Sequence, residues 1–227
     1  MIMKKTLLIM CLATLSLTAW AQEEKDELQG EVSTSLSSLR LANELVKYGY
    51  AQQEALPLIQ ALQIMKQTPT QNLNAEKEGE TVDLSQTDQK KGLVNLDYDK
   101  ILADAKVLAD GDNVLTELLA QVENAEVELS RGAVNGPKYT VEAVNGNGSD
   151  YYNISFVANY LAEIALCGDG DTDLDLYVYD SNGNLIASDT DYTDECYVCW
   201  VPKWTGRFRV KIVNRGPIYN RYVLITN

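Results

Sequence analysis

The chain of 227 residues contains no histidine. Histidine is the commonest general base in enzymes and the commonest protein ligand of transition metals. Its absence excludes Ser-His-Asp and Cys-His catalytic sites and zinc sites built on histidine. Paired carboxylates can still hydrolyse glycosides, but the clustered aspartates of this chain lie in one glycine-rich segment rather than on two sides of a cleft. We therefore expect a protein that is not an enzyme, with a carboxylate-dependent glycan hydrolase as the least favoured alternative.

Positive charge is also scarce, because 19 Lys and Arg stand against 33 Asp and Glu and leave a net charge of −14. Such a surface repels nucleic acid and anionic lipid, so we expect no nucleic-acid partner. It suits divalent cations or basic partners. The ordinary alternative is a soluble surface that keeps copies of the protein apart.

Long hydrophobic runs are missing too, since a membrane-spanning helix needs about 20 apolar residues. The apolar run Thr6–Thr18 follows Lys4 and Lys5 and ends just before Ala19-Trp20-Ala21. This pattern predicts a secretory signal peptide over residues 1–21, cleaved after Ala21. We expect a secreted or periplasmic protein without a membrane span.

Cysteine is rare, and Cys167, Cys196 and Cys199 remain once the predicted signal peptide is removed. An odd number allows at most one internal disulfide in an oxidising compartment. In a strand, Cys196 and Cys199 point to opposite faces, which argues against a bond between them. Two alternatives remain: a disulfide from Cys167 to one of the other two, or three unpaired thiols.

The N-terminal half has the apolar spacing of helices. One amphipathic helix is predicted from Leu36 to Gly49, and a second over Leu56–Met65 with Pro57 in its first turn. A third pattern covers Tyr98–Leu108, and a fourth helix follows a cap at Asp112. We expect a small helical bundle over residues 22–130, interrupted by a polar linker at about 67–92.

The C-terminal half alternates with the period of strands, after a linker rich in Gly, Asn and Pro at 131–138. Eight short strands separated by Gly, Asn and Asp turns predict an antiparallel β-sandwich over residues 139–227. The fold class is therefore α+β, in two parts. The predicted strands are Tyr139–Val144, Tyr152–Ala158, Ala162–Cys167, Asp173–Asp180, Leu185–Ser188, Tyr197–Val201, Arg207–Asn214 and Tyr222–Thr226.

Two of these strands have one apolar and one polar face. The apolar sets are predicted to face the core: Leu174, Leu176, Val178, Phe208, Val210 and Ile212. If the two strands are neighbours, Asp173 and Asp175 face Arg209 and Lys211, and such ion pairs need no metal. On the same polar face, Tyr177 and Tyr179 are candidates for a surface that stacks on a sugar or packs against a protein; the alternative is a structural cover over the sheet.

The loop Gly168–Asp173 concentrates negative charge, because three of its aspartates alternate with small residues. A hard divalent cation would relieve their repulsion. The spacing up to Asp180 mimics an EF-hand loop, but Leu174 stands where the sharp turn needs glycine. Two interpretations remain: surface ion pairs, or a loop site for calcium. The candidate calcium ligands are Asp169, Asp171, Asp173, Asp175 and Asp191, with Asp189 and Asp194 nearby in the sequence.

Several motifs resemble those of a known family: Gly170–Asp180, Gly183-Asn184-Leu185, Trp200-Val201-Pro202, Thr205-Gly206, Val213–Gly216 and Asn220-Arg221-Tyr222. Together they resemble the bacterial pre-peptidase C-terminal domain and its collagen-binding-type relatives, over about residues 139–227. The resemblance implies a jelly-roll-like sandwich, in some members stabilised by calcium, that serves targeting, solubility or substrate attachment. Here a helical segment precedes it rather than a peptidase domain, and that segment resembles uncharacterised secreted bacterial proteins.

These features predict a non-catalytic secreted or periplasmic protein that binds or targets, with a calcium-stabilised sandwich and a protein or glycan ligand. The alternative is an envelope accessory or scaffold protein whose helical half docks a protein partner.

Overall fold

The computed structural model describes residues 33–82, 96–125 and 136–227. The predicted signal peptide, and most of the predicted linker at 131–138, lie outside the described residues. In the described ranges no helix is long and apolar enough to cross a membrane. The described part is α+β, as predicted. Its helices are α2 (Thr34–Gln52), α3 (Ala55–Gln67), α4 (Tyr98–Leu108) and α5 (Asn113–Asn124).

The strands form two sheets of five. The first sheet has the order β1-β3-β10-β5-β8 and the second has the order β2-β4-β9-β6-β7. All neighbours are antiparallel except β1 and β3, which run parallel. The strands are β1 (Gln71–Asn72), β2 (Lys77–Glu78), β3 (Lys138–Val144), β4 (Ser149–Phe156), β5 (Ala162–Gly168), β6 (Leu174–Tyr179), β7 (Leu185–Asp189), β8 (Glu195–Trp200), β9 (Gly206–Asn214) and β10 (Asn220–Thr226).

Local hydrogen bonds and residue types explain where three of the helices begin. Ser33 accepts a hydrogen bond from the Leu36 amide at the start of α2. Asp112 accepts hydrogen bonds from the Val114 and Leu115 amides, so the predicted cap of α5 is confirmed. Pro57 lies in the first turn of α3, where the missing N–H leaves no hydrogen bond unmade.

The inner faces of the two sheets make the sandwich core. The apolar sets predicted on β6 and β9 are buried there, together with Tyr152, Tyr222 and Leu224. Every second residue of these strands points inward, so the alternation in the sequence places one whole face of each strand in the core.

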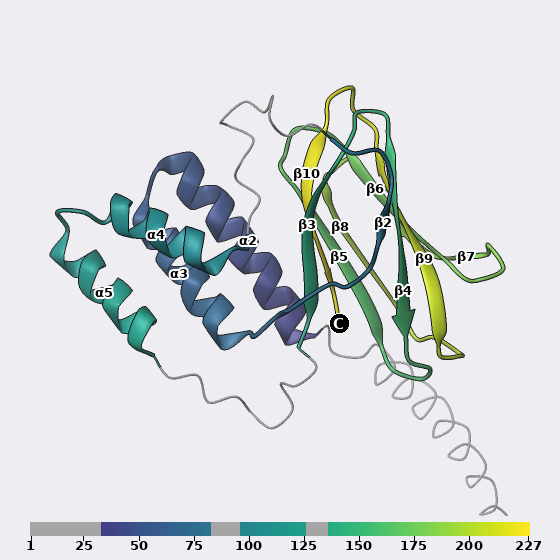
Figure 1. The fold of residues 1–227 in the computed structure, drawn as a ribbon, viewed down its shortest axis with the longest axis horizontal. Coiled ribbons are helices and arrows are strands. Elements are labelled where there is room, and N and C mark those ends of the chain that lie inside the picture. Colours follow the sequence, from purple (N-terminus) through teal and green to yellow (C-terminus); the bar gives the residue numbers. More distant parts are fainter. Residues whose placement is uncertain (1–32, 83–95, 126–135) are drawn as a thin grey trace, which may run out of the picture. The chain divides into compact units, whose positions relative to one another are not determined.

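The helices cover the outer face of the first sheet, beside β3 and β10 in Figure 1. The side chains of Ala165, Val223 and Ile225 point away from the sandwich core. They pack in one apolar cluster with the helices. All seven residues of β5 are consequently buried. A strand buried on both faces has a near-continuous apolar sequence, and Ala162–Gly168 is apolar apart from Glu163.

Polar contacts attach α2 to the first sheet at both ends. The Ser33 amide donates to both oxygens of the Glu163 carboxylate, at 3.0 and 3.2 Å. Near the other end of the helix, the Lys47 ammonium lies 3.2 Å from the Glu195 carboxylate on β8. The helical bundle and the sandwich therefore share both an apolar interface and directed polar contacts.

The polar segment predicted as a linker is ordered in its described part and belongs to the sandwich. We name residues 71–78 the strap: β1 adds to the edge of the first sheet and β2 adds to the edge of the second. Between them Leu73 and Ala75 pack against the sandwich core. The linker prediction missed this pairing because edge strands are joined by backbone hydrogen bonds, which a polar sequence can make as well as an apolar one.

Candidate functional site

The outer face of the second sheet is not covered by any described helix or strand (Figure 1). The strand register sets side chains of β4, β9 and β6 in one row across it. Tyr151 lies opposite Lys211, and Lys211 lies opposite Tyr177. In the next row Arg209 lies opposite Tyr179. We call these five residues, Tyr151, Tyr177, Tyr179, Arg209 and Lys211, the tyrosine face.

Rings and cations alternate on the tyrosine face. The rings of Tyr177 and Tyr179 are stacked, with centroids 6.3 Å apart and planes 19° apart. The guanidinium carbon of Arg209 lies 4.6 Å from the centroid of the Tyr151 ring. The Lys211 ammonium lies 5.8 Å from the Tyr151 ring and 6.0 Å from the Tyr177 ring. These distances suit cation–π contacts, which hold the long basic side chains over the rings.

The charges on this face are only partly neutralised. Arg209 lies 2.8 Å from the Glu78 carboxylate on the strap. Lys211 makes no ion pair with any residue in the described ranges. A locally positive, aromatic surface thus stands on a protein whose net charge is −14.

The sequence predicted that Asp173 and Asp175 face Arg209 and Lys211, and for Asp175 this prediction was wrong. The strands β6 and β9 are neighbours, as the prediction required, but Asp175 lies opposite Val213. Its carboxylate instead pairs with Arg215, just beyond the end of β9, and accepts a hydrogen bond from the Tyr177 hydroxyl at 2.9 Å. Burial and the Asp175 carboxylate raise the pKa of Tyr177. Asp175 therefore positions Tyr177, and its charge is balanced by Arg215.

The remaining aspartates predicted as calcium ligands lie in the loops between β5 and β6 and between β7 and β8. Both Asp169 oxygens accept backbone hydrogen bonds, from Asp171 at 3.3 Å and from Arg221 at 2.9 Å. Asp191 accepts hydrogen bonds from the amide and hydroxyl of Thr193. In the described ranges, no group of three or more carboxylates or thiols is gathered closely enough to hold a metal ion.

Asp173 differs from the other acidic residues of the loop. One of its carboxylate oxygens is buried and has no hydrogen-bond partner in the described part of the chain. Burial raises the pKa of Asp173, as do the carboxylates of Asp175, Asp191 and Asp194, against the opposing effect of Arg215. The surroundings of Asp173 therefore suit a cation. Calcium binding stays a prediction.

Asp180, the last position of the EF-hand-like spacing, has a structural role. Its carboxylate accepts hydrogen bonds from the amides of Asn182 and Asn184, both at 2.8 Å. The hydrogen bond from the Asn184 side chain and these backbone bonds lower the pKa of Asp180. The residue closes the β6–β7 turn, which is a common use of aspartate.

The three cysteines are free thiols, and the register explains why. Cys167 pairs with Glu195 across β5 and β8 and faces the helices, whereas Cys196 pairs with Leu166 and is buried in the sandwich core. Cys199 lies opposite Glu163, four positions along β5 from Cys167. Of the two alternatives that the sequence left open, the structure shows three unpaired thiols, because neither Cys196 nor Cys199 lies across from Cys167 on the same face.

Sequence reasoning placed Tyr177 and Tyr179 on the polar face of their strand and missed Tyr151 and Arg215. The sequence did contain a signal for Tyr151. Tyr152, Ile154 and Phe156 recur at every second position and are buried, so Tyr151 falls on the opposite face of the strand. Arg215 follows the end of β9, so strand periodicity could not predict its contact.

Comparisons with known proteins find solved structures that resemble part of this chain, but they do not assign the chain to a family. No model of a known protein family matches the chain, and no curated protein matches it. A pre-peptidase C-terminal domain of a collagenase from Bacillus anthracis is 12% identical, covers 40% of this chain and 88% of its own, and has a TM-score of 0.33. A periplasmic inhibitor of g-type lysozyme from Aeromonas hydrophila is 11% identical over 44% of this chain and 91% of its own, also with a TM-score of 0.33.

A carbohydrate-binding module from Cellvibrio mixtus lichenase 5A, solved with cellotriose, is 11% identical and covers 41% of this chain and 79% of its own, with a TM-score of 0.25. All three TM-scores are below 0.5. The predicted resemblance to pre-peptidase C-terminal domains is thus supported only in part, and these similarities carry no argument about function.

Proposed function

We propose that this chain is a non-catalytic binding protein of the periplasm or cell exterior, and that the tyrosine face holds a glycan that carries carboxylate groups. The observation that carries the proposal is the juxtaposition of three tyrosine rings with Arg209 and Lys211 on an open sheet face. The absence of histidine from the chain favours binding over catalysis.

The chemistry of the face suits such a ligand in two ways. Tyrosine rings are large, rigid and amphipathic, so they bury apolar ligand surface at a small cost in side-chain entropy. The stacked pair Tyr177 and Tyr179 offers a platform for the apolar face of a sugar ring. Lys211 and the guanidinium of Arg209 add charge-assisted hydrogen bonds to a carboxylate beside that ring.

Affinity electrophoresis tests the proposal, with polygalacturonate in one gel and a neutral glucan in another. We expect polygalacturonate to retard the protein and the neutral glucan to retard it less. Tyr177→Ala should abolish retardation because the stacking platform is lost, whereas Tyr177→Phe should keep most of it because the ring remains.

Tyr192→Ala is the matched control, since Tyr192 is 97% exposed, lies in the β7–β8 loop and is not one of the five residues of the tyrosine face. This variant should migrate like the unmodified protein in both gels. Retardation of Tyr177→Ala equal to that of Tyr192→Ala, or no retardation of any variant, would reject glycan binding at this face and favour the scaffold role of the helical half.

A second proposal concerns calcium as a stabilising ion. The buried and unpartnered oxygen of Asp173 supports it, because a hard cation is the natural partner of such a group. Asp173 would be the ion's carboxylate ligand, and the ion would also neutralise Asp191 and Asp194, whose charges act on Asp173 although the three are not gathered into a preformed site. The ion would neutralise the loops at the end of the sandwich and would take no part in a reaction.

A further inference from the structure

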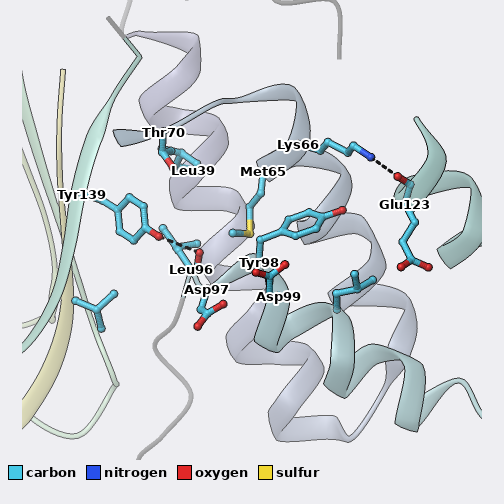
Figure 2. Close-up of a pocket in the computed structure, with 12 residues that line it drawn as sticks. Leu39, Met65, Lys66, Thr70, Leu96, Asp97, Tyr98, Asp99, Glu123 and Tyr139 are labelled. Carbon is cyan, nitrogen blue, oxygen red and sulfur yellow. Dashed lines mark hydrogen bonds between the residues drawn. The ribbon is translucent and has the colours of Figure 1, made fainter. Parts of the chain in front are cut away.

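A cavity of about 760 Å³ lies between the helices and the outer face of the first sheet (Figure 2). This volume falls in the range of small-molecule binding sites, about 300 to 1,000 Å³. The cavity is separate from the tyrosine face, which belongs to the other sheet. Its lining residues come from all four described helices, from the segments before α4 and after α3, and from β3: Leu39, Met65, Lys66, Thr70, Leu96, Asp97, Tyr98, Asp99, Leu102, Glu123, Tyr139 and Val141.

The interior of the cavity is largely apolar. Leu39 and Leu96 are buried, and Met65 and Leu102 pack against the same apolar cluster while remaining partly exposed. Figure 2 shows the Met65 side chain beside the ring of Tyr98. A ligand that enters here gains contact with aliphatic carbon, a thioether and an aromatic face, all of which favour an apolar body.

The charged groups of the lining are mainly acids, and its one cation is already engaged. The Lys66 ammonium donates to the backbone carbonyls of Val122 and Glu123, at 2.6 and 2.7 Å. The Glu123 carboxylate pairs with Lys106. Asp99, in the first turn of α4, makes no ion pair with any residue in the described ranges. An approaching ligand therefore meets the Asp99 carboxylate, which has no ion-pair partner among the described residues, whereas the donors of Lys66 are already used by two carbonyls.

Burial and these acids raise the pKa values of two tyrosines that line the cavity. Burial raises the pKa of Tyr98, and the nearby Glu123 and Asp99 carboxylates raise it further. Burial and Asp97 act in the same direction on the pKa of Tyr139. Both rings lie in a negative potential, which favours a cation and disfavours an anion.

We propose that this cavity binds a small amphipathic cation, with its apolar tail between Met65, Leu102 and the Tyr98 ring and its ammonium head at Asp99. The ring face of Tyr98 adds a cation–π contact to the head group. An anionic amphiphile of the same length would place its carboxylate against Asp99 and is rejected. The proposal does not depend on glycan binding at the tyrosine face.

Isothermal titration calorimetry with two ligands of the same tail and opposite charge tests the proposal. Decyltrimethylammonium and decanoate are titrated below the concentrations at which they form micelles. We expect one molecule of decyltrimethylammonium to bind per chain, with an affinity at least tenfold above that of decanoate. Equal affinity for the two, or no binding of decyltrimethylammonium, would overturn the proposal.

Two variants place the ligand in the cavity. Asp99→Asn should weaken decyltrimethylammonium binding about tenfold, whereas the matched control Asp110→Asn, an exposed residue outside the lining, should leave it unchanged. Leu102→Trp should fill the cavity and abolish binding, and its thermal unfolding curve shows whether it folds. If Asp99→Asn binds as tightly as Asp110→Asn, the head group does not lie at Asp99 and the proposal fails.

Discussion

The strap is held to the sandwich by a lysine that reaches a buried carboxylate, and this contact makes a quantitative prediction. Asp150 on β4 is 1% exposed and accepts a hydrogen bond from the Tyr222 hydroxyl at 2.8 Å. The Tyr222 hydroxyl lies 2.7 Å from that of Tyr152, inside the core. Lys77 on the strap lies 3.4 Å from Asp150 and donates to the Ala143 carbonyl at 2.9 Å. Among the described residues, the Lys77 ammonium is the cation that neutralises this buried group.

Lys77→Met removes the charge and keeps most of the side-chain volume. Breaking a buried ion pair by removing one partner costs about 3 to 5 kcal/mol, because the other charge stays buried without compensation. Lys77 keeps 18% of its side chain exposed, so water can partly replace it and we take the lower end of that range. A loss of about 3 kcal/mol in the free energy of unfolding lowers Tm by roughly 6 to 12 °C for a unit of 150 to 250 residues.

The loss should depend on pH in a defined direction. Burial raises the pKa of Asp150 above its ordinary 3.8, although the Tyr222 hydroxyl and Lys77 act to lower it. The folded protein therefore binds this proton more tightly than the unfolded chain. The stability linked to the group is complete below the unfolded pKa and is lost as pH rises through the folded pKa. Without Lys77 the folded pKa rises further, so the difference between variant and parent grows with pH and disappears at about pH 3.

Urea unfolding followed by tryptophan fluorescence, at several pH values, measures these differences. The control is Lys100→Met. Lys100 forms an ion pair with Asp104 on the surface, where the two side chains are 54% and 35% exposed, respectively. Such pairs contribute less than about 1 kcal/mol. Adding Asp150→Asn to Lys77→Met should restore part of the loss. If Lys77→Met costs no more than Lys100→Met, or costs as much at pH 3 as at pH 7, the reasoning is refuted.

Three further predictions concern the loops, the thiols and a helix cap. Calcium at a hundredfold excess over its Kd should stabilise the protein by about 2.7 kcal/mol relative to chelator, and Asp173→Asn should remove that gain; equal melting in both buffers would reject the site. A thiol reagent should label Cys199 in the folded protein but reach Cys167 and Cys196 only on unfolding, since burial hides both and raises their pKa; native labelling of all three would contradict this. Asp112→Ala should cost about 1 kcal/mol in urea unfolding, because the first amides of α5 lose their acceptor, and an unchanged midpoint would show that the cap contributes nothing.

Much of the fold was predictable because its signals are local. The 3.6-residue period of apolar side chains located α2, α3, α4 and α5, and the two-residue period located the eight strands from β3 to β10. The same alternation assigned Leu176 and Val210 to the core and Tyr177 to the outer face. Each of these predictions depends on a regular backbone that repeats within a few residues, so neighbours in the sequence carry the necessary information.

The tertiary structure alone decided which distant segments meet. Strand alternation could not show that the strap joins both sheets, that Asp175 pairs with Arg215 rather than Arg209 or Lys211, or that Lys77 neutralises Asp150. The cavity beside Asp99 also exists only once the helices pack on the first sheet. By itself the sequence determined the four helices, the strands from β3 to β10, their buried faces and the shortage of positive charge. Register, edge pairing and burial of charge depend on contacts between residues far apart in the chain, and those contacts have no local period.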